Sequence, residues 1–197
     1  MTVAREPAWQ RVARLGLVVR WTTLREGLCG VGADRSGLTP GDVSAWAQAR
    51  LDDPGFDPPA ELFALVAIPT TTGSDRDSLA AVIPVVEQLA AAERAEAAIE
   101  ARKWRLAELV ALVDRVETWE PTSDTECDDR SCQMWSWVRE LWEAWAPVER
   151  PAFFFRPDRN LVSCYCGRDL YRVVGDYRAW IEAERAVLLA ADRDAAG

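Results

Sequence analysis

Residues 104–116 read WRLAELVALVDRV, and their apolar side chains recur every three or four positions. This spacing places them on one face of an α-helix, with most of the charged side chains on the other. The same period appears in residues 132–145 and again from Val173 to Leu188 near the C-terminus. We therefore expect long amphipathic helices to supply most of the core.

The sequence gives little indication of β-strands. Only residues 15–21 and 152–156 form short runs that could be extended. We therefore predict an all-α fold, a helical bundle with a cysteine-bearing C-terminal loop and a long final helix. Residues 1–157 are expected to form the helical domain, and residues 158–197 an extension that packs on it.

Capping and breaking signals place the helices of the first half. A short helix is predicted over residues 21–28. Thr39 is a good N-cap, and Pro40 fits the first position of the helix that follows. That helix is expected to end at the DPGFDPP run of residues 53–59, and another is predicted over residues 59–66.

The middle of the chain is strongly helix-prone. Residues 75–117 predict a long helical pair, with a kink or break at Pro84. Within it, residues 90–102 are rich in Ala, Glu and Arg and are expected to be mostly solvent-facing. In the final helix, Gly175 lowers helical stability by about 1 kcal/mol relative to alanine but need not end the helix.

Composition excludes several classes of protein. The chain has 197 residues, 49% of them hydrophobic, and ten tryptophans, so it can build a real core. Its net charge of −9 argues against nucleic-acid binding, because phosphate contacts require dense Lys and Arg. We see no secretion signal and no segment near the ~20 apolar residues of a membrane span. We expect a cytoplasmic protein whose partner is basic.

The chain contains no histidine, which removes the commonest general base and metal-binding imidazole. Lys103 is the only lysine, and no Ser-x-x-Lys spacing includes it. A nucleophilic serine or cysteine would therefore lack its usual activating partner. We predict that the protein is not an enzyme.

Four cysteines form two close pairs in turn-rich stretches: Cys127 with Cys132, and Cys164 with Cys166. Four thiolates from two loops could hold a tetrahedral zinc ion, the only cofactor that the sequence implies. Neither spacing is the common two-residue knuckle, so two disulfides or free thiols remain alternatives. Cys29 is expected to be an ordinary core residue.

The loop before the aromatic helix is acidic, with Asp124, Glu126, Asp128 and Asp129. Paired acids can hydrolyse glycosides or hold magnesium, but such a loop is also typical of a solvated surface. Helical spacing predicts that Trp137 points away from the inward face of its helix. Its exposure would indicate a partner surface, whereas burial under the C-terminal tail is the competing interpretation.

Four stretches carry a resemblance to known proteins: residues 21–28 (WTTLREGL), 37–47 (GLTPGDVSAWA), 103–106 (KWRL), and 137–145 (WVRELWEAW) followed by Arg156-Pro157. Their order resembles a family of small helical bacterial proteins of unknown function. Some members are encoded near polymorphic toxins and are interpreted as immunity proteins. The resemblance covers about residues 12–157 and implies no catalytic residues. The tail from Leu161 onward has no counterpart in it.

The sequence thus predicts a non-enzymatic, acidic protein-binding module, with an immunity protein that neutralises a basic toxin as its concrete form. Electrostatic steering toward a cationic partner is the physical reason. The residues expected to bind the partner are Asp124, Glu126, Asp128, Asp129 and Trp137. The alternative is a small protein with a structural zinc ion held by four cysteines and a regulatory or structural role.

Overall fold

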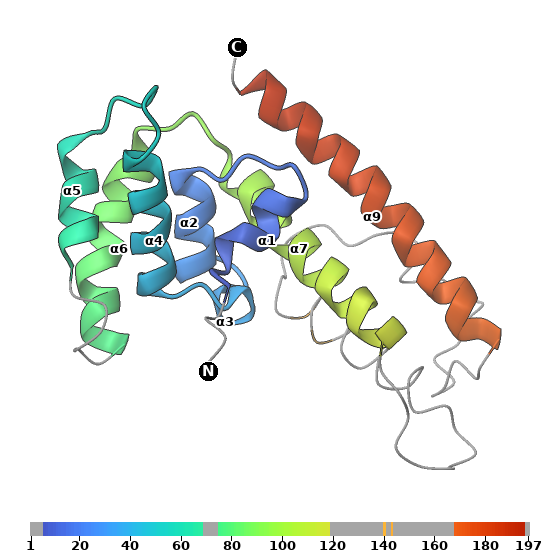
Figure 1. Cartoon of the computed structure of the whole chain (residues 1–197). Helices are drawn as coiled ribbons and strands as arrows, with labels where there is room; N and C mark the ends of the chain where they lie inside the picture. Colours follow the sequence, from blue (N-terminus) through green and yellow to red (C-terminus); the bar gives the residue numbers. More distant parts are fainter. Residues whose placement is uncertain (1–5, 69–74, 119–139, 141–142, 144–167, 196–197) are drawn as a thin grey trace.

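The computed structural model describes residues 6–68, 75–118, 140, 143 and 168–195. Within these ranges it contains eight helices and no strand, so the predicted all-α fold is confirmed (Figure 1). The helices are α1 (Trp9–Arg14), α2 (Trp21–Cys29), α3 (Ala33–Ser36), α4 (Pro40–Leu51), α5 (Ala60–Ala67), α6 (Asp75–Ala91), α7 (Ala97–Thr118) and α9 (Arg168–Asp194).

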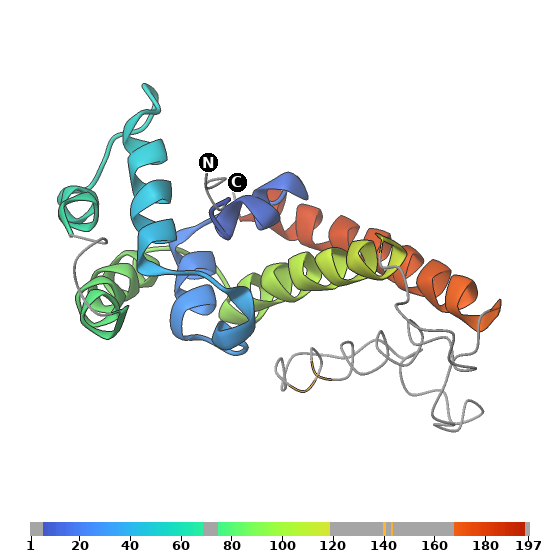
Figure 2. The ribbon, with the colours of Figure 1, turned by 60° about the horizontal axis from the view of Figure 1, so that its bottom comes forward.

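The helices form two groups, one around α2 and one made by α7 and α9. Helices α5 and α6 pack with α4, and α6 also packs against α2, so these four helices gather at one end of the molecule (Figure 1). The first half of α7 packs against α2, and α7 then runs beside α9, as Figures 1 and 2 both show. Helix α7 therefore joins the helices of the first half to the C-terminal helix.

The local signals for helix ends in the first half are confirmed. The side chain of Thr39 accepts a hydrogen bond from the amide of Asp42, whose carboxylate accepts one from the amide of Thr39. Pro40 follows at the first helical position. This reciprocal cap satisfies backbone amides that the helix itself leaves unpaired. The predicted helix at residues 59–66 is also present, as α5.

The predicted helical pair over residues 75–117 is present, as α6 and α7. Both helices form, and α6 continues through Pro84, but each packs mainly against another helix: α6 against α2, and α7 against α2 and α9. The reason lies in the turn between them. The Glu93 carboxylate accepts hydrogen bonds from the amides of Trp21 and Thr22, at 3.0 and 2.8 Å, and so caps α2. Most of residues 90–102 are exposed or partly exposed, as predicted, whereas Ala90, Glu100 and Ala101 are buried.

No strand forms at residues 15–21, because side chains distant in sequence satisfy the backbone there. The carbonyl of Leu15 accepts a hydrogen bond from Arg185 of α9, at 2.7 Å. The amide of Val18 donates to Asp192, also of α9, at 2.8 Å. The segment thus crosses to α2 without a neighbouring strand. The other candidate strand, residues 152–156, lies outside the described residues.

Helix α9 confirms the predicted long final helix. Its buried face includes Tyr177, Ile181 and Leu188, which the periodicity placed inside. Gly175 does not end the helix: an added methyl group there would meet no atom within 4 Å.

Helices α2 and α7 approach closely where Gly27 meets Trp104. Trp104 is fully buried, and its indole nitrogen donates a 2.6 Å hydrogen bond to the carbonyl of Thr23. A Cβ atom added at Gly27 would lie 2.7 Å from the indole ring of Trp104. Only glycine allows this approach, because the buried ring has no space to retreat.

We expect Gly27→Ala to destabilise the protein by about 1–3 kcal/mol, since the new methyl group overpacks the indole. The matched control Gly175→Ala should stabilise it by about 0.5–1 kcal/mol, because it removes a glycine from an open helix interior. Urea unfolding of the two variants measures both effects. Equal stability of the two variants would show that α2 and Trp104 do not meet as described.

Candidate functional site

The site residues predicted from the sequence lie outside the described residues: Asp124, Glu126, Cys127, Asp128, Asp129, Cys132, Trp137, Cys164 and Cys166. The zinc and disulfide hypotheses and the acidic-loop hypothesis therefore stay predictions. Among the described residues, no group of three or more candidate ligand side chains could hold a metal ion. Elemental analysis of the purified protein, with Cys164→Ser as the control, decides the zinc hypothesis.

Cys29 corrects one expectation, because it is exposed rather than part of the core. It is the last residue of α2, where the chain enters a turn, and its thiol donates to the carbonyl of Arg25 at 3.4 Å. Partial burial of the sulfur and the carboxylates of Glu87 and Glu26 raise the pKa of this thiol. A raised pKa keeps the thiol protonated at neutral pH and so disfavours it as a nucleophile.

The most unusual feature of the interior is a buried lysine. Lys103 is the only lysine in the chain, and its side chain is 0% exposed. Its ammonium group donates to the carbonyl of Val18 at 2.9 Å, to Glu100 at 2.9 Å and to Asp192 at 2.7 Å. These three acceptors use all three protons of the group. Lys103 is therefore a structural cation rather than an available base.

Two further side chains complete this ion network, which we define as Arg20, Thr23, Glu100, Lys103 and Asp192. The guanidinium of Arg20 lies 3.3 Å from Asp192, and the hydroxyl of Thr23 donates to Glu100 at 2.5 Å. Two cations thus face two carboxylates. The network joins the start of α2, the first half of α7 and the end of α9.

A second buried cluster lies about two turns away along α9. Glu184 accepts two hydrogen bonds from Arg102, at 2.7 and 2.6 Å, and a third from Arg105 at 3.3 Å. The guanidinium carbon of Arg105 lies 5.4 Å from the ring centroid of Trp180, within range of a cation–π contact. Residues 103, 104 and 105 are all fully buried. Because consecutive residues of a helix point in different directions, other parts of the protein surround this turn of α7.

Ionisation of the buried Glu100 carboxyl costs stability. Burial raises the pKa of Glu100; Asp192 adds to the rise, while Lys103 and Thr23 act against it. Burial likewise raises the pKa of Glu108, against the effect of Arg11. Each of these two groups therefore contributes to the free energy of unfolding, and its contribution is fully present below the ordinary glutamate pKa. The contribution is lost as the pH rises through the raised pKa of the folded state, so the protein becomes less stable.

We expect Lys103→Met to destabilise the protein by about 3–5 kcal/mol at neutral pH, because Glu100 and Asp192 lose a buried cation. The control Arg94→Met, at an exposed position in the turn after α6, should change stability by less than about 0.5 kcal/mol. Urea unfolding measures both. A loss below about 1 kcal/mol in Lys103→Met would contradict the network.

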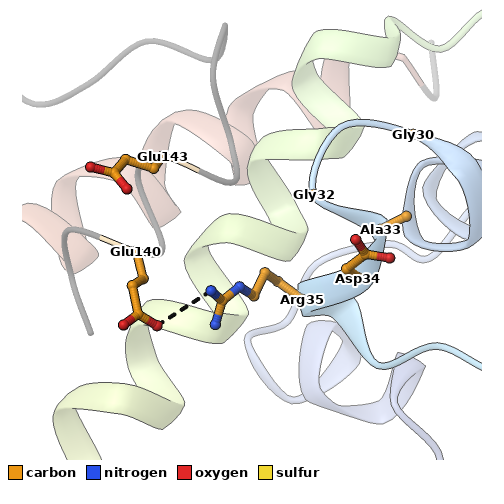
Figure 3. Close-up of a pocket in the computed structure, with 7 residues that line it drawn as sticks. All are labelled: Gly30, Gly32, Ala33, Asp34, Arg35, Glu140 and Glu143. Atoms are coloured by element: carbon orange, nitrogen blue, oxygen red, sulfur yellow. Dashed lines mark hydrogen bonds and ion pairs between the residues drawn. The ribbon is translucent and has the colours of Figure 1, made fainter. Parts of the chain in front are cut away.

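An open cavity of about 520 Å³ lies between the segment around α3 and two residues of the second half. Its lining residues are Gly30, Gly32, Ala33, Asp34, Arg35, Glu140 and Glu143 (Figure 3). Arg35 reaches across to Glu140 at 3.3 Å, while Glu143 points away from that pair. Both partners are about half exposed, so the pair adds less than about 1 kcal/mol. An exposed ion pair in an open cavity cannot shield a reaction from water.

Charge is distributed very unevenly along the chain. Residues 39–93, which span α4, α5 and α6, contain nine aspartates and glutamates but two arginines, a net charge of −7. Residues 1–38 contain six arginines and three acids, a net charge of +3. We call residues 39–93 the acidic layer. Residue counts by segment would have revealed it from the sequence.

The acids of this layer lie mostly on the surface. Asp52, Asp53, Asp57 and Glu87 are all exposed. One of the two arginines of the layer, Arg50, is held against the protein: it pairs with Asp53 at 3.3 Å and lies over the ring of Phe56 at 4.2 Å. The acidic layer is therefore a negatively charged surface, suited to a cationic partner.

Comparisons with known proteins add no identification. The chain matches no family model, no curated protein and no solved structure. Across the part of the chain that the structure describes, no helix is both long and apolar enough to cross a membrane.

Proposed function

We propose that the protein is a non-enzymatic binding module whose acidic layer docks a basic protein. Its concrete form is an immunity protein that neutralises a basic toxin. The observation that carries the proposal is the net charge of −7 on residues 39–93, with five of the nine acids exposed: Asp52, Asp53, Asp57, Asp77 and Glu87. Such a surface attracts a cationic protein and speeds its association.

Several of the chain's cations face acids in the interior. Lys103 and Arg105 are fully buried, and Arg20 and Arg102 are partly buried, each facing Glu100, Glu184 or Asp192. These cations neutralise internal acids and contribute little to the surface. The acidic layer holds few cations of its own, so its field remains uncompensated.

The chemistry of the described residues also favours binding over catalysis. Lys103 has its ammonium protons engaged, and the thiol of Cys29 has a raised pKa. The carboxylates of the open cavity are exposed to solvent. A surface that acts through its charge needs none of these groups.

The test is capture of the affinity-tagged full-length chain from its native host, with mass spectrometry of what binds stoichiometrically. We expect a protein of pI above about 9 that is toxic when expressed alone and harmless when expressed together with this chain. Absence of a stoichiometric partner, or an acidic partner, would contradict the proposal.

Matched charge variants then test the role of the acidic layer. Asp52→Asn, Asp53→Asn and Asp57→Asn together should slow association with the captured protein about tenfold at low salt. The control triple Glu96→Gln, Glu182→Gln and Asp194→Asn also removes three negative charges, at exposed positions outside the acidic layer. It should slow association less than twofold. Equal effects in stopped-flow measurements would show that only net charge matters.

A further inference from the structure

Helix α5 is apolar on both of its sides. Leu62 and Leu65 face inward and are fully buried. On the other side, Ala60, Phe63, Ala64 and Ala67 are all exposed, and Phe63 is 56% exposed. Their spacing of three, four and seven residues places them in one line along the helix. We call these four residues the α5 stripe.

The α5 stripe is held on a well-fixed helix at the edge of the molecule. Helix α5 packs on α4 and α6, and the side chain of Gln88 in α6 donates to Glu61 at 2.9 Å. In both views α5 is the outermost helix at its end of the molecule (Figures 1 and 2). A helix whose inward and outward faces are both apolar is normally enclosed, so an outward face of this kind indicates a missing neighbour.

Acidic residues lie within α5 and in the segments that precede and follow it in the chain. Asp57 lies just before the helix, Glu61 lies within it, and Asp77 lies in the first turns of α6, which follows it in the chain. Asp57 and Asp77 are exposed. An aromatic side chain surrounded by small apolar residues and bordered by charge has the anatomy of a binding hot spot with a polar rim.

We propose that the α5 stripe is the docking point of the basic protein partner, which places an apolar side chain on Phe63 and a cation against Asp57. This inference rests on the proposed function and names the surface that performs it. Charge selects the occupant: a second copy of the chain would bring two acidic layers of −7 together, whereas a basic protein neutralises one.

Photo-crosslinking in the native host tests the α5 stripe in the full-length chain. The probe is benzoylphenylalanine, introduced as Phe63→benzoylphenylalanine. The matched control is Val187→benzoylphenylalanine on α9, since Val187 is also a large exposed apolar residue, at 49%. We expect position 63 to yield an adduct with a protein of pI above about 9, in at least about tenfold greater amount than position 187.

Affinity measurements complete the test. With the crosslinked protein purified, Phe63→Ser should weaken its binding about tenfold or more, and Val187→Ser less than twofold. Both variants should unfold at the wild-type urea concentration, because each changes an exposed residue.

The outcomes separate the two proposals. If the basic protein binds Phe63→Ser as tightly as wild type, or crosslinks equally at position 187, the proposal that the α5 stripe is the docking point is wrong and the proposed function stands. An adduct between two copies of the chain at position 63 also overturns the α5 proposal. If neither position nor the affinity capture yields a basic protein, both proposals fail.

Discussion

The structure depends on one buried cation. The ammonium group of Lys103 holds the carbonyl of Val18 before α2, Glu100 in its own helix and Asp192 near the end of α9. These groups come from three parts of the chain that no local pattern brings together. A buried ion pair is seldom a net source of stability, but breaking one is costly. Arrangements that bury Lys103 without these partners are therefore disfavoured.

The placement of cations inside has a consequence for the surface. The acids Glu100, Glu184 and Asp192 of α7 and α9 form ion pairs with Lys103, Arg105 and Arg20. The acidic layer of residues 39–93, in contrast, has nine acids and two arginines. Stability and charge are thus divided between different parts of the molecule. The helices around α7 hold the fold together, and α4 to α6 present a negative surface with the α5 stripe on it. Binding by such a surface requires no rearrangement of the core.

Much of the fold could be predicted from sequence, and the physical reason is local. Helical periodicity and the cap at Thr39 depend on neighbouring residues alone. Residues 15–21, a run that could have been extended, form no strand, because the backbone there bonds to side chains of α9 more than 160 positions away. The burial of Lys103 was missed because lysine is normally exposed, and its three acceptors come together only in the fold. The α5 stripe was missed because alanine and phenylalanine in a short helix also fit a core.

Amine acetylation tests the central claim most directly, because Lys103 is the only lysine in the chain. An N-hydroxysuccinimide ester modifies free amines, and peptide mass spectrometry then reports a single side chain. The account predicts that Lys103 in the folded protein reacts at least about 100 times more slowly than in urea, since reaction requires unfolding. Acetylation of the folded protein at the rate of an exposed lysine would contradict the account.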